Sequence, residues 1–162
     1  MRRTDREVRN PETIVRIMEE CPVMRIGLSD GEFPYIVPVN FAYEYSDGKF
    51  FLYFHGALAG RKYELLKQNG KCSFEMDRQI SVKLMPENRG VTTLYRSVMG
   101  NADVVFLEGS EKNEALKKLM GRYEESRGFD CDFSCTRGTA AVKLCVTEIS
   151  AKENMRVLEE TE

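Results

Sequence analysis

The residues best suited to chemistry lie together in one short segment, F-H-G-A-L-A-G-R-K, at positions 54–62. His55 is the only histidine of the chain, and an imidazole can accept or donate a proton near neutral pH. The small-residue stretch 56–60 follows it, and glycine lets a ligand approach the backbone closely. Arg61 and Lys62 then place two cations beside this turn. The segment therefore combines a proton carrier, a flexible turn and a pair of cations.

The pair of cations lies where the sequence pattern predicts the first turns of a helix over residues 58–68. A helix start carries unpaired N–H groups and the positive end of the dipole, so it favours Asp and Glu over Arg and Lys. Two cations there predict a bound anion: Arg61 can clamp two oxygens of a phosphate, and Lys62 can act as a point charge. The alternative is that both are solvated surface residues and that His55 is a packed, hydrogen-bonded side chain.

Alternating strands must position this segment. Residues 33–43 alternate along their length, which places five residues on one face: Tyr35, Val37, Val39, Phe41 and Tyr43. The hairpin turn 46–48 leads into a returning strand over 50–55, on which Phe51, Tyr53 and His55 share a face. The small-residue turn and the two cations therefore follow directly from the end of a strand.

The rest of the chain reads as further strands with two more helices. We expect helices over 10–21 and 110–126, strands over 23–28, 72–76, 92–108 and 140–149, and irregular polar segments over 78–91 and 128–137. Gly100 and Asn101 indicate a bulge or a bend in the long strand. Consecutive strands joined by tight turns predict an antiparallel sheet curled into a small barrel, with the helices packed outside.

Composition limits the class of protein. The chain has 162 residues, 42% hydrophobic and 31% charged, which predicts a single domain over 1–162, with residues 1–8 and 156–162 loosely ordered. The net charge of −2 argues against general nucleic-acid binding. No apolar run approaches the roughly 20 residues of a membrane span, and the charged N-terminus does not resemble a secretory signal. We therefore expect a cytoplasmic protein.

The five cysteines indicate reduced thiols, because they are odd in number and a reducing compartment keeps thiols free. Cys131 and Cys135 form the only close pair. Together with Cys145 and the distant His55 they make a poor zinc site, which needs about four ligands. We expect no metal site.

Several motifs together resemble the pyridoxamine-5′-phosphate-oxidase-like flavin-binding family, and within it the branch that contains the nitroimidazole-resistance (Nim) proteins. These motifs are P-Y-I-V-P-V-N-F at 34–41, H-G-A-x-x-G-R-K at 55–62, C-S-F-E-M at 72–76 and Y-R-S-V-M-G-N-A at 95–102. The resemblance covers roughly residues 8–155. It implies a mainly β fold with flanking helices, the FMN-binding split β-barrel, and a homodimer with two FMN molecules at the interface.

The resemblance also implies roles for individual residues. Gly60, Arg61 and Lys62 would hold the FMN phosphate. Residues of the first motif would line the isoalloxazine ring: Val37, Pro38, Val39 and Asn40. His55 would lie beside the cofactor or over the substrate, and three residues would approach from the partner chain: Tyr95, Arg96 and Ser97. Pro38 removes a backbone donor, which suits an edge strand or a bulge.

The leading functional hypothesis is an FMN-dependent oxidoreductase acting on a small aromatic or nitro compound, with NADH or NADPH as a candidate donor. Arg96 would stabilise the reduced anionic flavin, and His55 would donate a proton. We interpret the loop 131–138 as a plain connection; the alternative is that it covers the ligand pocket, with Arg137 as a substrate contact. The mostly acidic segment 150–162 lacks the arginine pattern of the vitamin-synthesising enzymes of the family, so their oxidase activity is not expected. The alternatives are a non-catalytic carrier or sensor of FMN or another flat ligand, and a dimerisation module without a ligand.

Overall fold

The protein is described from a computed structural model, over residues 3–85, 89–123 and 133–155. The strands are β1 (Glu7–Val8), β2 (Met24–Leu28), β3 (Tyr35–Val39), β4 (Ala42–Ser46), β5 (Lys49–Ala57), β6 (Lys71–Met85), β7 (Gly90–Leu107) and β8 (Thr139–Asn154). The α-helices are α1 (Pro11–Glu20), α2 (Arg61–Asn69) and α3 (Gly109–Arg122), and two 3-10 turns are η1 (Thr4–Arg6) and η4 (Ser134–Gly138). Cys131 and the predicted loose end 156–162 lie outside the described residues.

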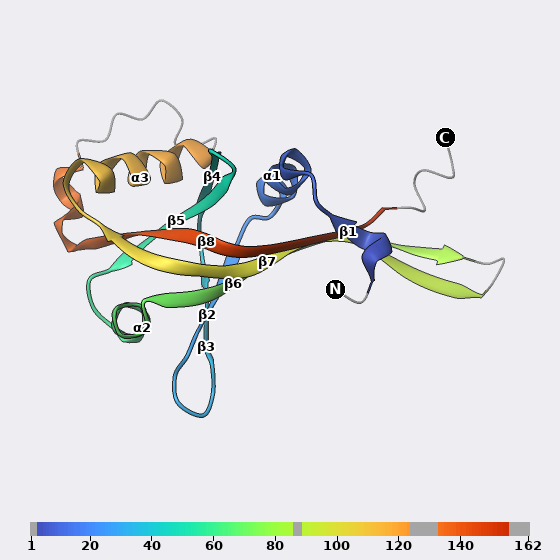
Figure 1. Cartoon of the computed structure of the whole chain (residues 1–162), viewed down its shortest axis with the longest axis horizontal. Coiled ribbons are helices and arrows are strands. Elements are labelled where there is room, and N and C mark those ends of the chain that lie inside the picture. Colours follow the sequence, from blue (N-terminus) through green and yellow to red (C-terminus); the bar gives the residue numbers. More distant parts are fainter. Residues whose placement is uncertain (1–2, 86–88, 124–132, 156–162) are drawn as a thin grey trace.

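The strands form one antiparallel sheet in the order β3-β2-β6-β7-β8-β5-β4, and β1 pairs with β8. Strands β3 and β4 lie at opposite edges of this order, yet only residues 40 and 41 separate them along the chain. The sheet must therefore curl until its two edges approach each other. Figure 1 shows α1 and α3 above this curled sheet and α2 below it. The predicted antiparallel barrel with outer helices is confirmed.

Residues 33–43 form two strands instead of the single strand that we predicted. Strand β3 pairs with β2, whereas β4 pairs with β5. Phe41 and Ala42 are both buried, and they join two different hydrophobic clusters. Two successive buried residues break the period of two, because the chain crosses from one edge of the sheet to the other at this point.

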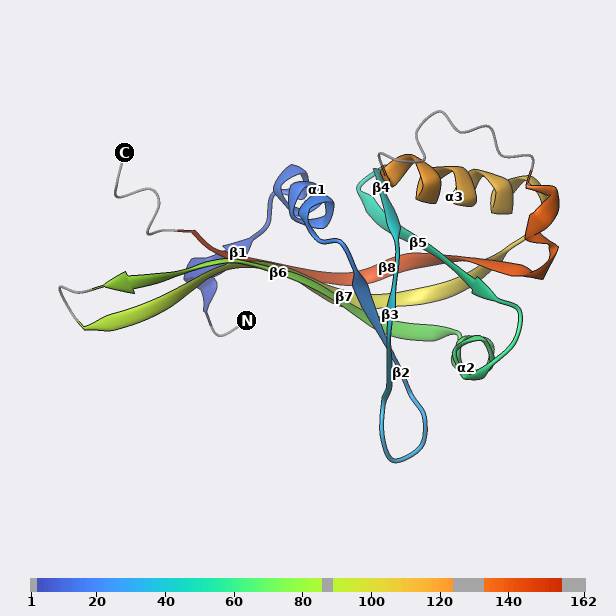
Figure 2. The same cartoon turned by 180° about the vertical axis from the view of Figure 1, so that it is seen from behind.

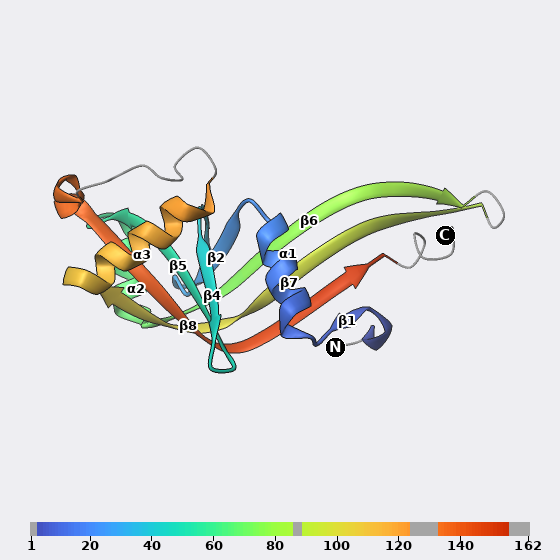
Figure 3. The same cartoon turned by 90° about the horizontal axis from the view of Figure 1, so that it is seen from above.

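Residues 78–91 do not form the irregular segment that we predicted, as far as they are described. They extend β6 to Met85 and begin β7 at Gly90, with a register shift between Gln79 and Ser81. The resulting hairpin projects far beyond the rest of the molecule (Figures 1 and 3), and we call it the arm. The strand signal is present in the sequence, because Ile80, Val82 and Leu84 alternate with Ser81 and Lys83, and our prediction passed over it.

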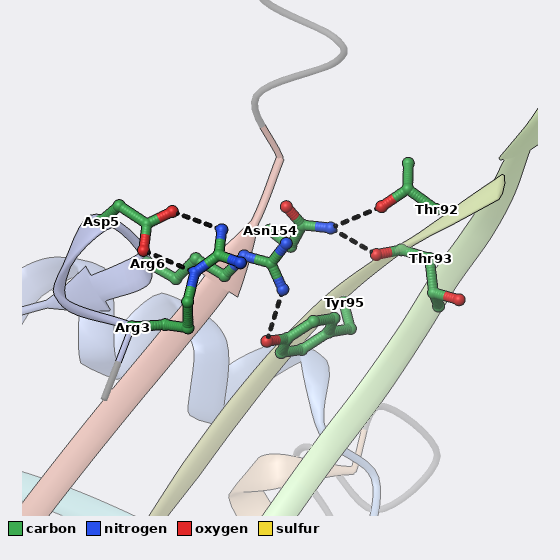
Figure 4. A network of polar contacts seen from close by, with 7 residues as sticks. All are labelled: Arg3, Asp5, Arg6, Thr92, Thr93, Tyr95 and Asn154. Carbon is green, nitrogen blue, oxygen red and sulfur yellow. Dashed lines mark hydrogen bonds and ion pairs between the residues drawn. The ribbon is translucent and has the colours of Figure 1, made fainter. Parts of the chain in front are cut away.

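The base of the arm is held by the two ends of the chain (Figure 4). Asn154 is buried, and its amide donates to the Thr92 hydroxyl at 3.2 Å and to the Thr93 carbonyl at 2.6 Å. Arg6 donates to the Tyr95 hydroxyl at 3.4 Å. Strand β1 and the Arg6 contact attach residues 6–8 to the sheet.

Helix α1 begins as its sequence predicts. The Asn10 side chain accepts from the N–H groups of Glu12 and Thr13, and Pro11 occupies the first helical position. At the other end, the Arg122 guanidinium of α3 donates to the carbonyls of Met18 and Cys21, at 2.8 and 2.6 Å. Arg122 thereby adds a donor at the C-terminal end of α1, where the Met18 carbonyl also accepts from the Cys21 N–H.

Candidate functional site

The corner between β5 and α2 contains the turn and the two cations of the motif. The helix begins at Arg61 and not at residue 58, because Gly60 turns the chain with φ 96° and ψ 169°. Positive φ is strained for residues with a side chain, so glycine suits this position. No side chain caps the first N–H groups of α2. Figure 2 shows α2 lying beside the end of β5.

Arg61 already has an anionic partner within the protein. Its guanidinium pairs with the Asp30 carboxylate through Nε and Nη2, and it lies 5.9 Å from the centre of the Tyr35 ring. Asp30 belongs to the turn between β2 and β3. The unusual cation at the helix start is thus partly explained by a carboxylate that lies 31 positions earlier in the chain.

Lys62 has no such partner. Its ammonium lies 5.8 Å from the centre of the Phe54 ring, and no carboxylate of the described residues forms an ion pair with it. The side chain is partly buried, and this burial lowers the pKa of Lys62. A side chain on Gly56 would come within 3.1 Å of Lys62 Nζ, so the glycine leaves room for the ammonium. A partly desolvated cation beside free N–H groups can bind a phosphate.

His55 lies on the other face of β5. Phe54 and Gly56 both contact the space around Lys62, and successive side chains of a strand point to opposite faces. His55 is exposed and shares its face with Phe51 and Tyr53, as the alternation predicts. Within one chain, the imidazole and the ammonium therefore do not converge on one point.

The motif that we expect to line the flavin ring lies on the edge strand β3. Val39 is buried and Val37 packs against the core, so their side chains point inward. Pro38 and Asn40 are exposed, as is Ile36, at 62%. Only the side chains of these three residues and the backbone of the strand are therefore available to a ligand. The edge position suits Pro38, because an edge strand has a row of N–H groups that need no partner in the sheet.

Tyr95, Arg96 and Ser97 lie in the middle of β7, near the base of the arm. The Arg96 side chain is 15% exposed and pairs with two carboxylates, with Glu20 and, at 3.2 Å, with Glu153. Gly56 and Arg96 pair with Ala140 and Glu153 of β8, which are 13 residues apart (153 − 140). At about 3.3 Å per residue, this separation is roughly 40 Å along the strand. Arg96 could meet the Lys62 corner only from another chain.

The loop 131–138, for which a plain connection and a cover over the ligand pocket were the two interpretations, is described from residue 133 onward. The Leu58 N–H donates to the Gly138 carbonyl at 3.3 Å, so the end of this loop lies beside the turn before α2. Arg137 is exposed. Sequence reasoning missed Asp30, because the segment 29–31 reads only as a turn and nothing local connects it to Arg61.

The described cysteines are free thiols, and two of them are buried. Burial raises the pKa of Cys21 to about 11 and that of Cys72 to about 12. Because the thiolate is the reactive form, we expect a thiol reagent at pH 8 to label Cys135 at least tenfold faster than Cys21 or Cys72. Peptide mapping after timed labelling of the native protein measures this ratio, and equal rates would contradict it. No group of residues in the described ranges could hold a metal ion.

The fold defines a class of protein, the split β-barrels of the pyridoxamine 5′-phosphate oxidase type. A family model described as pyridoxamine 5′-phosphate oxidase matches residues 10–153, so the chain belongs to that family. No curated protein matches the chain. No helix among the described residues combines the length and hydropathy that a bilayer crossing needs.

Solved structures agree with the family. A proposed 5-nitroimidazole antibiotic resistance protein from Bacteroides thetaiotaomicron superposes with TM-score 0.77 at 26% identity, over 91% of this chain and 86% of that one. The flavocytochrome Anf3 from Azotobacter vinelandii superposes with TM-score 0.74 at 20% identity, over 96% of this chain and 72% of that one. A FAD and heme binding protein from Mycobacterium smegmatis superposes with TM-score 0.72 at 15% identity, over 92% of this chain and 73% of that one. The last two likenesses support the fold.

Proposed function

We propose that the chain is an FMN-dependent oxidoreductase that reduces a small aromatic or nitro compound. The observation that carries this proposal is the partly buried side chain of Lys62, which belongs to the first turn of a helix that no side chain caps and which has no ion-pair partner among the described residues. Membership of the family suggests a flavin, and the terminal phosphate of FMN is an anion of the right kind for this corner. The domain would extend over 1–162.

The residues present fit an FMN molecule. Lys62 would be the main phosphate contact, and Arg61, whose side chain is 63% exposed, would contribute less because Asp30 already offsets its charge. Gly60 would bring backbone N–H groups to the phosphate oxygens. The ring would lie against the backbone of Val37 and Val39 and against the exposed side chains of β3, Pro38 and Asn40.

When bound, the flavin would supply the electron transfer, and the protein would bind and orient the reactants. His55 is exposed on β5, where it could donate a proton to a substrate. Arg96 would act from the partner chain together with Tyr95 and Ser97. The carboxylates of Glu20 and Glu153 hold the Arg96 guanidinium in a defined position, although they also compensate its charge.

The proposed assembly is a homodimer, and the arm supports it. Its outward face exposes Val82, Leu84 and Val91 at 52, 74 and 66%. Apolar side chains that adjoin on a projecting hairpin favour contact with another chain. We expect Leu84→Asp with Val91→Asp to convert a dimer to a monomer at micromolar concentration, as measured by light scattering after size-exclusion chromatography.

Tyr45→Asp is the control for the arm variant. Tyr45 is 42% exposed and lies on β4, away from the arm. It should leave the dimer intact. A dimer that survives both arm substitutions would exclude the arm from the interface.

The absorption spectrum of the protein purified without added cofactor tests the function. We expect a flavin spectrum, FMN as the compound released on denaturation, and bleaching on addition of NADH or NADPH, followed by reoxidation with a nitroaromatic acceptor. A flavin that neither donor bleaches would favour the non-catalytic carrier, and a different flat ligand would favour a sensor. Colourless protein that ignores added FMN would overturn the proposal and favour a dimerisation module. The expected location is the cytoplasm, where both nucleotides are present.

A further inference from the structure

Asp30 lies at the corner where we place the flavin phosphate, although no sequence motif includes it. We propose that Asp30 makes the site selective for FMN over FAD, because its carboxylate offsets the charge of Arg61 whereas Lys62 has no carboxylate partner among the described residues. This inference rests on the proposed function, because it assumes that a flavin phosphate binds beside Lys62. It concerns which flavin the site accepts, and not whether a flavin binds.

Asp30 is held firmly in place. Its side chain is 19% exposed, and its Oδ2 atom accepts from two nitrogens of Arg61. The turn that carries it is also fixed at the other end of the helix, where Asn69 Nδ2 donates to the Ser29 carbonyl at 2.9 Å. Side chains from both ends of α2 therefore bind the turn 29–31. A carboxylate with two such attachments cannot easily move away from an approaching anion.

The two cations consequently differ in charge available to a ligand. Arg61 and Asp30 together are neutral, whereas Lys62 has no carboxylate partner in the part of the chain that the structure describes. A phosphate monoester concentrates about −1.5 to −2 charges on one group at pH 7, which matches one ammonium with the adjacent helix N–H groups. This arrangement is complementary to a single terminal phosphate.

A diphosphate has a different distribution of charge. Its two phosphates each carry about one negative charge, so the group beside Lys62 binds less strongly than a dianion. The second phosphate must lie next to the first, where the neighbouring residue is Arg61, already paired with Asp30. It would gain little from Arg61 and would be repelled by the carboxylate. Each phosphate of FAD is therefore expected to bind more weakly than the single phosphate of FMN.

Flavin titrations followed by fluorescence quenching test the inference, with riboflavin, FMN and FAD as ligands of the full chain. We expect the unmodified protein to bind FMN at least tenfold tighter than FAD. Asp30→Asn should reduce this ratio at least fivefold, mainly through tighter FAD binding, because it releases the charge of Arg61. Asp30→Glu should keep the preference, because it keeps the carboxylate.

Asp103→Asn is the matched control. Asp103 accepts from Lys71 at 2.9 Å in an exposed ion pair of β6 and β7, so its loss should leave the FMN to FAD ratio unchanged. Equal affinities for FMN and FAD in the unmodified protein, or an unchanged ratio in Asp30→Asn, would overturn the role of Asp30 while flavin binding stands. Protein that binds neither flavin would instead overturn the proposed function.

A second measurement covers the case in which Asp30→Asn does not fold. Inorganic phosphate and pyrophosphate are then used as competitors of FMN on the unmodified protein. We expect pyrophosphate to displace FMN no better than phosphate at equal concentration. Displacement by pyrophosphate at a severalfold lower concentration would show that the corner accepts adjoining phosphates, which contradicts the inference.

Discussion

We expect Lys62→Ala to lower the affinity for FMN about 10- to 100-fold. A hydrogen bond to a charged group contributes about 1.5–3 kcal/mol, and about 1.4 kcal/mol corresponds to a tenfold change in the dissociation constant. The loss should fall on FMN and spare riboflavin, because riboflavin has no phosphate. Titration of both ligands, followed by quenching of flavin fluorescence, measures the difference.

Lys67→Ala is the control for this prediction. Lys67 lies on the same helix, is exposed, and has its ammonium 5.4 Å from the centre of the Tyr63 ring. Its removal should change the affinity for FMN by less than about twofold, since Lys67 lies in the last turn of α2 and an exposed charge there is screened by solvent from a phosphate at the first turn. Arg61→Ala should have an intermediate effect, because Asp30 already offsets its charge. An unchanged affinity in the Arg61→Ala, Lys62→Ala double variant would show that the phosphate binds elsewhere.

Gly100→Ala should destabilise the protein by about 3 kcal/mol. The β-carbon of an alanine at this position would lie 2.1 Å from the Glu148 carbonyl oxygen and 2.7 Å from the Phe74 ring. Both neighbours are rigid, because one is strand backbone and the other is a buried core side chain. Urea unfolding of the two proteins, followed by circular dichroism, measures the change in the free energy of unfolding.

Gly121→Ala provides the matched substitution. Gly121 lies in α3, and a β-carbon there would meet no atom within 4 Å. Alanine in a helix should stabilise the protein by about 0.5–1 kcal/mol, because glycine loses more backbone entropy on folding. Two substitutions with the same chemistry should thus change stability in opposite directions. A small loss in Gly100→Ala would mean that β7 and β8 can separate at this point.

The irregularity near Gly100 shows what a local sequence pattern can and cannot predict about a bulge. The pair Gly100-Asn101 predicted a bulge or a bend, and the register between β7 and β8 does shift between Asn101 and Ala102. The extra residue lies on β8, at Thr147, which the pattern in β7 could not indicate. A sequence can mark where a strand is irregular, whereas the pairing of the two strands decides which of them carries the additional residue.

The sequence by itself determined the alternating strands, the start of α1 at Asn10 and Pro11, and the motifs that led to the family. These features depend on neighbours within a few residues, because the periods of helices and strands are properties of the local backbone. The same locality placed Phe51, Tyr53 and His55 on one face of β5.

Tertiary structure alone decided which charges meet. Asp30 reached Arg61, Glu20 and Glu153 reached Arg96, and Lys62 remained without a carboxylate partner among the described residues. Each of these outcomes depends on how the sheet curls and on where the turns between its strands fall. Contacts between residues that are tens of positions apart follow from packing, and packing leaves no repeating signal in the sequence.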